Sequence, residues 1–197
     1  MKKSAQVHKR SLRADALKGF SAKREAFGFT LVELLVVIAI IAILAAVVVL
    51  IINPLELTRR GRDAARLSDL ANLQNAINVA VQEATGSASA ILCEGGTVPC
   101  NGSSNVGTRA TDGSGWIKVN LSSSKSVSVP TLPVDQLNTA VNHYTYCSDG
   151  NGWEIDAALE SQQQSGKAGG DGGNDPVLYE VGSNLNLIAS SGGSCTY

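Results

Sequence analysis

Groups that commonly carry catalysis are scarce in this sequence. It has two histidines, His8 and His143, and it contains no G-x-S-x-G, H-E-x-x-H or glycine-rich phosphate-loop motif. Its serines cluster in stretches with loop composition and have no neighbouring base that would activate a nucleophile. His143 lies beside a predicted strand, where a turn or strand-edge role is commoner than a catalytic one. Nothing in the sequence supports an enzyme, and we expect none.

Charge is almost absent from one long stretch. Residues 29–52 are apolar except for Thr30 and one carboxylate, Glu33. As a helix this stretch would extend about 36 Å, which is enough to cross a hydrocarbon core of roughly 30 Å. Its length therefore predicts a membrane-spanning helix. An ionisable group in such a helix is usually kept for a function, although Glu33 could also simply mark the helix end near the headgroups.

Positive charge is concentrated before this stretch. Residues 1–28 contain eight Lys or Arg and two acidic residues, whereas the rest of the chain contains eight basic and fifteen acidic residues. By the positive-inside rule, the basic flank keeps the N-terminus in the cytoplasm and places everything after Ile52 outside. Four arginines shortly after Ile52 favour the opposite orientation, but the flank outnumbers them. We therefore expect a single-pass protein of the inner, cytoplasmic membrane with a periplasmic or extracellular C-terminal part.

Residues Gly28–Ile41, together with the short basic leader before them, resemble the processing and assembly segment of type IV pilins and the related pseudopilins. The resemblance implies that a membrane peptidase cuts between Gly28 and Phe29 and that the new N-terminal Phe29 is methylated. It also implies that Glu33 pairs with the amino group of Phe29 of a neighbouring subunit. The residue types suit these roles, because glycine offers no side chain to obstruct a protease and a carboxylate in an apolar fibre core needs a cationic partner.

The resemblance also implies an α+β, pilin-like fold. A long N-terminal helix, whose first half spans the membrane, would pack against an antiparallel β-sheet head with disulfide-tied loops. The expected parts are a cleaved basic leader at 1–28, a transmembrane and assembly helix at 29–53, its amphipathic second half at 54–85, and a globular β head with Gly- and Ser-rich loops at 86–197.

The function that the resemblance implies is assembly. The chain would be a structural subunit, major or minor, of a type IV pilus or related filament. The alternatives are a pseudopilin of a type II secretion system and a membrane-anchored extracellular binding domain that never polymerises. The implied partners are further copies of the chain, the prepilin peptidase and methyltransferase, the pilus or secretion assembly machinery, and the membrane.

A helical pattern continues after the membrane stretch. Pro54 predicts a kink, because proline removes a helical hydrogen bond and clashes with the preceding turn. Beyond it, apolar residues recur every three or four positions and predict one buried face. This face consists of Leu67, Leu70, Leu73, Ile77, Val81 and Ala84. The opposite face is predicted to be exposed and consists of Asp63, Arg66, Asp69, Asn72, Asn75, Gln82 and Glu83. Gly86 is the expected stop signal.

Four arginines follow the kink, at positions 59, 60, 62 and 66. We favour solvated or subunit-pairing charge for them over contact with DNA, because no aromatic residues are interleaved with them. No nucleic-acid partner is therefore predicted. Contact with lipid headgroups before assembly is compatible with this interpretation.

The four cysteines all follow the membrane stretch. An even number in an exported domain predicts two disulfides. Four cysteines allow three pairings, of which we favour Cys93 with Cys100, because this spacing closes a short loop, and Cys147 with Cys195. Zinc binding is the less favoured alternative, since paired C-x₂-C halves are absent.

The rest of the chain is expected to form strands and loops. Residues 85–115 have the composition of a connecting loop. Strands are predicted by alternation and β-propensity at 116–121, 143–147 and 153–157, with two weaker candidates at 177–181 and 185–188. A turn at 149–152 would join the second and third of these as a hairpin.

An acidic, glycine-rich segment precedes the last strands. It resembles the C-terminal end of major pseudopilins, where such a loop can hold calcium, so Asp171, Asn174 and Asp175 are candidate Ca²⁺ ligands. The spacing is not that of an EF-hand, and these residues also form turns in solvated loops. We expect no required cofactor and leave calcium as a candidate.

Overall fold

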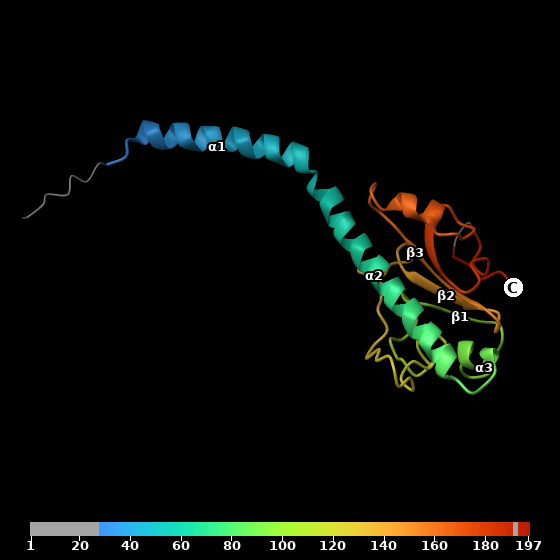
Figure 1. The fold of residues 1–197 in the computed structure, drawn as a ribbon. Helices are drawn as coiled ribbons and strands as arrows, with labels where there is room; N and C mark the ends of the chain where they lie inside the picture. Colours follow the sequence, from blue (N-terminus) through green and yellow to red (C-terminus); the bar gives the residue numbers. More distant parts are fainter. Residues whose placement is uncertain (1–27, 191–192) are drawn as a thin grey trace, which may run out of the picture. The chain divides into compact units, whose positions relative to one another are not determined.

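The computed structural model describes residues 28–190 and 193–197. The predicted leader, apart from Gly28, lies outside the described residues. The described elements in chain order are α1 (Leu31–Ile52), α2 (Pro54–Glu83), α3 (Ala88–Leu92), β1 (Cys100–Ser103), β2 (Tyr144–Ser148), β3 (Trp153–Ala158), the 3₁₀ helix η1 (Ser165–Gly170) and β4 (Leu178–Gly182). The chain divides into two compact units between Ala46 and Val47, within α1. The second unit contains α2 and the sheet (Figure 1).

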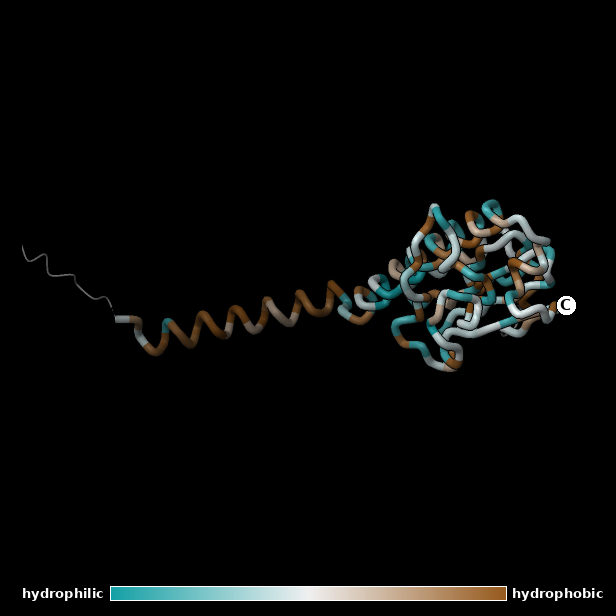
Figure 2. The backbone as a smooth tube through the Cα atoms, turned by 90° about the horizontal axis from the view of Figure 1, so that it is seen from below, coloured by the Kyte–Doolittle hydropathy of each residue, from teal (hydrophilic) through white to brown (hydrophobic). Residues whose placement is uncertain are grey.

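Helix α1 is apolar around its whole circumference. Its side chains are exposed along its full length, and none is buried against another part of the chain. Figure 2 shows the hydrophobic colour running along the helix. Among the described helices, α1 alone is long and apolar enough to cross a membrane, judged by length and composition. A helix that is hydrophobic on all sides needs a covering of lipid or protein.

The predicted break at Pro54 is confirmed, and the residue with the non-helical backbone is the preceding one, Asn53. Asn53 adopts a left-handed backbone conformation (φ 45°) between the two helices. Asparagine tolerates this conformation better than most residues, and proline fits the first position of a helix because its missing N–H has no partner there. The Asn53 side chain accepts a hydrogen bond from the Glu56 amide at 3.4 Å. These features end α1 and begin α2.

Helix α2 packs one face against the sheet, as predicted. Leu70, Leu73 and Ile77 are completely buried in the main core, where they meet the two buried tryptophans of the chain. The predicted stop at Gly86 is slightly late, because α2 ends at Glu83 and its cap residue Ala84 is already extended. The prediction for Asp63 and Arg66 was wrong, since both side chains lie inside the head and not on the exposed face.

The sheet is antiparallel, with the strand order β1-β2-β3-β4. The predicted hairpin is confirmed as β2 and β3, in which Thr145 pairs with Asp156, and β4 continues the sheet with Glu180 opposite Asp156. One face of the sheet carries Tyr144, Tyr146 and other core residues against α2. The opposite face, called the outer face below, is covered by the C-terminal segment, drawn red in Figure 1.

Three predictions about regular structure were wrong. Residues 116–121 do not form a strand. From Ile117 on, their side chains alternate between buried and half-buried, but their backbone bonds go to scattered loop residues, such as Thr108 and Thr111. Residues 185–188 are irregular because the amides of Leu187 and Ile188 donate to a side chain, the carboxylate of Glu154. The expected loop at 85–115 contains the short elements α3 and β1.

Candidate functional site

The predicted processing position is open in the structure. Gly28 and Phe29 are both exposed, with Phe29 80% accessible. A Cβ atom built on Gly28 would meet no atom of the described residues within 4 Å, and the residue needs no unusual backbone conformation. The fold of the chain therefore does not explain the glycine at this position. An accessible bond beside a residue without a side chain is what a protease requires.

Glu33 lies in the first turn of α1, where it forms a capping box with Thr30. The Glu33 Oε2 atom accepts hydrogen bonds from the Thr30 amide at 2.9 Å and from the Thr30 hydroxyl at 2.7 Å. In return, the Glu33 amide donates to the Thr30 hydroxyl oxygen at 3.2 Å. Such reciprocal bonds satisfy amide groups that a helix N-terminus otherwise leaves unpaired. The negative charge is also favourably placed at the positive end of the helix dipole.

The second carboxylate oxygen of Glu33 has a different environment. Oε1 accepts no hydrogen bond from any described residue, and the side chain is exposed. Glu33 can thus stay in its capping box through Oε2 while Oε1 receives a cation or hydrogen-bond donor from outside the chain. The predicted partner, the amino group of Phe29 in another subunit, is of this kind. Thr30 was overlooked in the sequence, although the spacing T-x-x-E is a known signature of a capping box.

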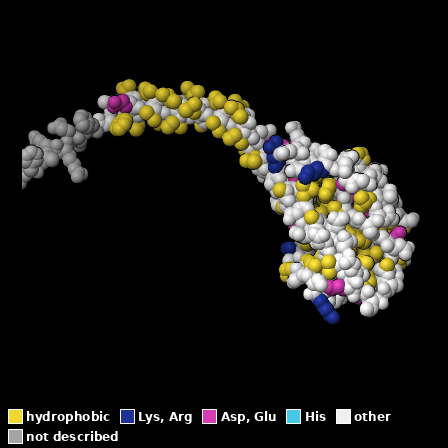
Figure 3. Space-filling view, in the orientation of Figure 1, with side chains coloured by type: hydrophobic (Ala, Val, Ile, Leu, Met, Phe, Trp, Pro, Cys, Tyr) yellow, Lys and Arg dark blue, Asp and Glu magenta, His cyan; other side chains and the backbone are white. Residues whose placement is uncertain are grey.

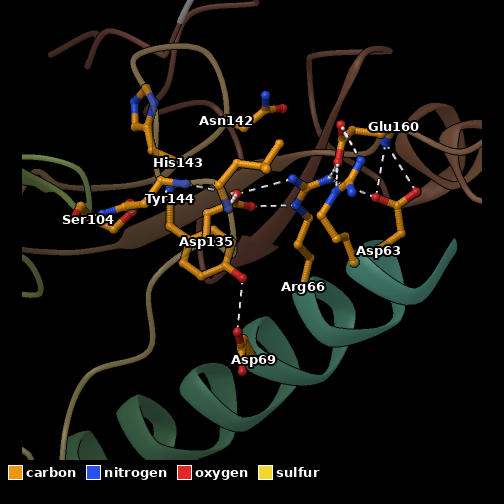
Figure 4. A network of polar contacts seen from close by, with 12 residues as sticks. Asp63, Arg66, Asp69, Ser104, Asp135, Asn142, His143, Tyr144 and Glu160 are labelled. Atoms are coloured by element: carbon orange, nitrogen blue, oxygen red, sulfur yellow. Dashed lines mark hydrogen bonds and ion pairs between the residues drawn. The ribbon is translucent and has the colours of Figure 1, made fainter. Parts of the chain in front are cut away.

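Arg66 is the centre of a buried ion-pair network that fastens α2 to the head (Figure 4). Its guanidinium binds Asp135 through Nε at 2.5 Å and Nη2 at 3.2 Å, and it binds Asp63 through Nη1 at 2.9 Å. Nη1 also lies 2.8 Å from a carboxylate oxygen of Glu160, to which Arg62 makes two further bonds. These residues come from α2, from the loop before β2 and from the segment that follows β3.

The network shifts the pKa of its members in the direction that keeps them charged. Burial lowers the pKa of Arg66, but the hydrogen bonds and negative charges of Asp135 and Glu160 outweigh burial and raise it. The hydrogen bond from Arg62 lowers the pKa of Glu160. Burial alone would raise the pKa of Asp135, yet the bonds from Arg66 leave it lowered. The charges in this network are therefore satisfied within the chain.

Both disulfides join the residues expected from the sequence. Cys93 is bonded to Cys100 and Cys147 to Cys195. The first closes the loop between α3 and β1. The second attaches the C-terminal segment to β2, where Leu187 and Ile188 cover the outer face of the sheet beside Cys147.

The candidate calcium ligands have structural roles in the loop before β4. Both carboxylate oxygens of Asp171 accept amide hydrogen bonds, from Gly173 at 3.0 Å and Glu180 at 2.8 Å. Asp175 accepts the Val177 amide at 2.8 Å, and the Asn174 amide group donates to a backbone carbonyl. Within the described residues, no three His, Cys, Asp or Glu side chains are grouped as a metal site. Calcium binding at this loop stays a prediction.

Two glutamates form a buried carboxyl pair on the outer face of the sheet. Glu154 and Glu180 are 0% and 2% exposed, and the Oε1 atom of each lacks a hydrogen-bond partner among the described groups. Burial and the neighbouring Glu180 carboxyl raise the pKa of Glu154 to about 8. Burial raises the pKa of Asp156, beside this pair, to about 7. No local sequence pattern indicates this pair, because its two members come from different strands, β3 and β4.

Comparison with known families identifies the N-terminal segment. Residues 23–49 match the prokaryotic N-terminal methylation motif. No curated protein and no solved structure matches the chain. The matched range includes Gly28, Phe29, Glu33 and most of α1, which are the residues that carried the resemblance to type IV pilins and pseudopilins. The match supports a type IV pilin-like or pseudopilin-like prepilin.

Proposed function

We propose that the chain is a structural subunit of a type IV pilus or a related filament, processed between Gly28 and Phe29 and polymerised through α1. The observation that carries this proposal is the combination of an apolar helix exposed on all sides with one carboxylate in its first turn. In the bilayer, lipid covers this helix, and in a filament the same helices of other subunits would cover it. The head then lies outside the membrane.

Glu33 would direct the assembly. Removing a carboxylate from water into an apolar fibre is costly unless a cation compensates it. Removal of the leader creates that cation, the amino group of Phe29, four residues from Glu33 in each copy. The open Oε1 atom of Glu33 can accept the amine of a neighbouring copy, while Thr30 retains Oε2. Charge pairing would then fix the axial position of each added subunit.

The open environment of Gly28 gives a direct test of processing. Gly28→Asp should block removal of the leader, because a charged side chain would stand at the cleaved bond. The fold should not change, since nothing lies within 4 Å of this position. Mass analysis of membrane fractions should show the full-length chain for Gly28→Asp and a chain beginning at Phe29 for the wild type.

Gly169→Asp is the matched control, because it introduces the same side chain at another open, exposed glycine. It should be processed normally. Leader removal at Phe29 in Gly28→Asp would argue against the proposal and would favour a membrane-anchored domain with no connection to this processing route.

A pseudopilin of a type II secretion system shares all these features. The abundance of the chain and the length of the fibres would distinguish a pilus from a pseudopilus. Long surface fibres containing the chain as a main component would indicate a pilus. A low-copy subunit confined to the cell envelope, whose loss stops protein secretion, would indicate a pseudopilus.

A further inference from the structure

We propose that the first two turns of α2 bind the headgroups of anionic phospholipids where the chain leaves the membrane. The residues concerned are Leu55, Leu57, Arg59 and Arg60, and we call them the interface collar. The inference depends on the proposed function in one respect, namely that α1 crosses a membrane. It adds a lipid contact on the exported side that the assembly role does not require.

The structure separates the four arginines of this region into two pairs. Arg62 and Arg66 are used within the chain, where they bind Glu160, Asp63 and Asp135. The side chain of Arg59, which is half-buried, makes no ion pair or hydrogen bond with a described residue. Arg60 makes a single bond to Glu56 at 3.3 Å, and its side chain remains 47% exposed.

The acidic residue nearest to the collar does not cancel its charge at the surface. Glu56 is only 8% exposed, and its Oε1 atom accepts the Gln162 amide at 3.0 Å in addition to the bond from Arg60. The negative charge is thus directed into the head, while Arg60 is exposed and Arg59 is half-buried. Figure 3 shows Lys and Arg side chains gathered at the beginning of α2.

The collar also exposes apolar surface. Leu55 and Leu57 are 57% and 60% exposed, although they stand in the first turns of a helix whose later residues Leu70 and Leu73 are fully buried. Exposed leucines combined with arginines suit the boundary between headgroups and acyl chains, where apolar side chains insert and long basic side chains reach phosphate. Water on all sides would leave these leucines without a partner.

Chain length places the collar at the correct depth. Arg59 follows Ile52, the last residue of α1, by seven positions, which is at most about 10 Å along a helix. The headgroup layer on each side of a bilayer is about 5 to 7 Å thick. Arg59 and Arg60 therefore stay within reach of lipid phosphates, and a negatively charged surface would attract them.

The test uses the full-length chain in nanodiscs with a tryptophan reporter at the collar. The two natural tryptophans, Trp116 and Trp153, are buried, so Leu57→Trp adds the exposed indole. Brominated phosphatidylglycerol should quench this indole more strongly than brominated phosphatidylcholine does, and added salt should remove the difference. Val106→Trp, at a position on the head that is 83% exposed, is the control and should show little quenching with either lipid.

Charge variants then test whether the lipid-dependent quenching comes from Arg59 and Arg60. In the Leu57→Trp background, the pair Arg59→Gln and Arg60→Gln should lose the phosphatidylglycerol-dependent quenching. The pair Arg59→Lys and Arg60→Lys should keep it, as should Lys125→Gln, which removes an exposed positive charge near the other end of α2.

Three outcomes would overturn the inference. Equal quenching by the two lipids would show that the collar does not select anionic headgroups. Unchanged quenching in the glutamine pair, with reduced fibre formation, would assign the arginines to contacts between subunits. A chain that fails to insert into nanodiscs would refute membrane anchoring itself, and with it the proposed function, whereas the first two results leave that function intact.

Discussion

Glu33 is already bound within its own helix before any partner arrives. The capping box with Thr30 occupies Oε2 and leaves Oε1 open. This arrangement explains how a carboxylate can be carried at the edge of a bilayer without being left entirely unpartnered. One side chain thereby stabilises the helix start and, in the proposed filament, would also accept the amine of another subunit.

At the same scale, the buried acids of the outer face make stability depend on pH. The raised pKa values of Glu154 (about 8) and Asp156 (about 7) mean that the folded chain holds protons that the unfolded chain loses above about pH 4 to 4.5. Their stabilising contribution is complete below that range and is lost as the pH rises through the folded values. The free energy of unfolding should therefore fall by about 1.4 kcal/mol per pH unit for each group.

Glu154→Gln tests this expectation. The glutamine oxygen can still accept the Leu187 and Ile188 amides, and its amide group can donate toward Glu180 as a protonated carboxyl would. Urea unfolding of the full-length chain in detergent, measured from pH 5.5 to 8, should give a shallower decline for the variant than for the wild type. Glu94→Gln, at an exposed site, should follow the wild type. Parallel declines in all three proteins would contradict a proton on Glu154.

At the scale of elements, α2 is attached to the head by two kinds of contact. Its C-terminal half contributes apolar side chains to the core, whereas its N-terminal half uses the Arg66 network. The network joins α2 to the loop before β2 and to the segment that follows β3. It therefore fixes the head on the part of the helix that follows the Asn53 break, where no apolar core holds it.

Arg66→Met should be strongly destabilising, because it leaves Asp63 and Asp135 buried without their cation. Removing one member of a buried ion pair typically costs about 3 to 5 kcal/mol. Arg59→Met removes an arginine outside the network and should change stability by about 0.5 kcal/mol or less. The test compares the free energies of unfolding of the two variants, measured in the same detergent. A loss below about 1 kcal/mol for Arg66→Met would mean that the network does not attach α2 to the head.

Element by element, the sequence was informative where the cause of structure is local. The break at Asn53 and Pro54, the apolar face of α2 and the β2–β3 hairpin depend on neighbouring residues, and each was predicted. Residues 116–121 alternate like a strand because they are half buried, but alternation does not supply a neighbouring strand to bond with. Strand β1 was missed because its sequence, CNGS, has little β-propensity.

In the candidate site, too, the sequence predicts local features but not contacts between distant segments. Gly28, Phe29 and Glu33 form a short contiguous motif, and the motif match covers them. Arg66 was assigned to the exposed face because its charge suggested water, while its partners Asp135 and Glu160 lie far along the chain. Glu154 and Glu180 meet only once strands β3 and β4 pair. Such contacts depend on the tertiary fold, so no local pattern reveals them.

At the scale of the whole molecule, the parts have separate tasks. The N-terminal segment and α1 carry the predicted processing site, the apolar surface and Glu33, which the matched motif covers up to residue 49. The head is held together by its own core, two disulfides and internal ion pairs. A filament built through α1 would display this head repeatedly along its length.

Assembly itself is measured by the amount of processed chain in surface fibres removed by shearing. The measurement compares the wild type with Glu33→Gln. The wild-type fibre fraction should contain a chain that begins at a methylated Phe29. Glu33→Gln should lose its leader normally but remain in the membrane fraction, because the open oxygen no longer carries the charge that the amine requires. Glu33→Gln chains in fibres at wild-type abundance would contradict assembly through this carboxylate.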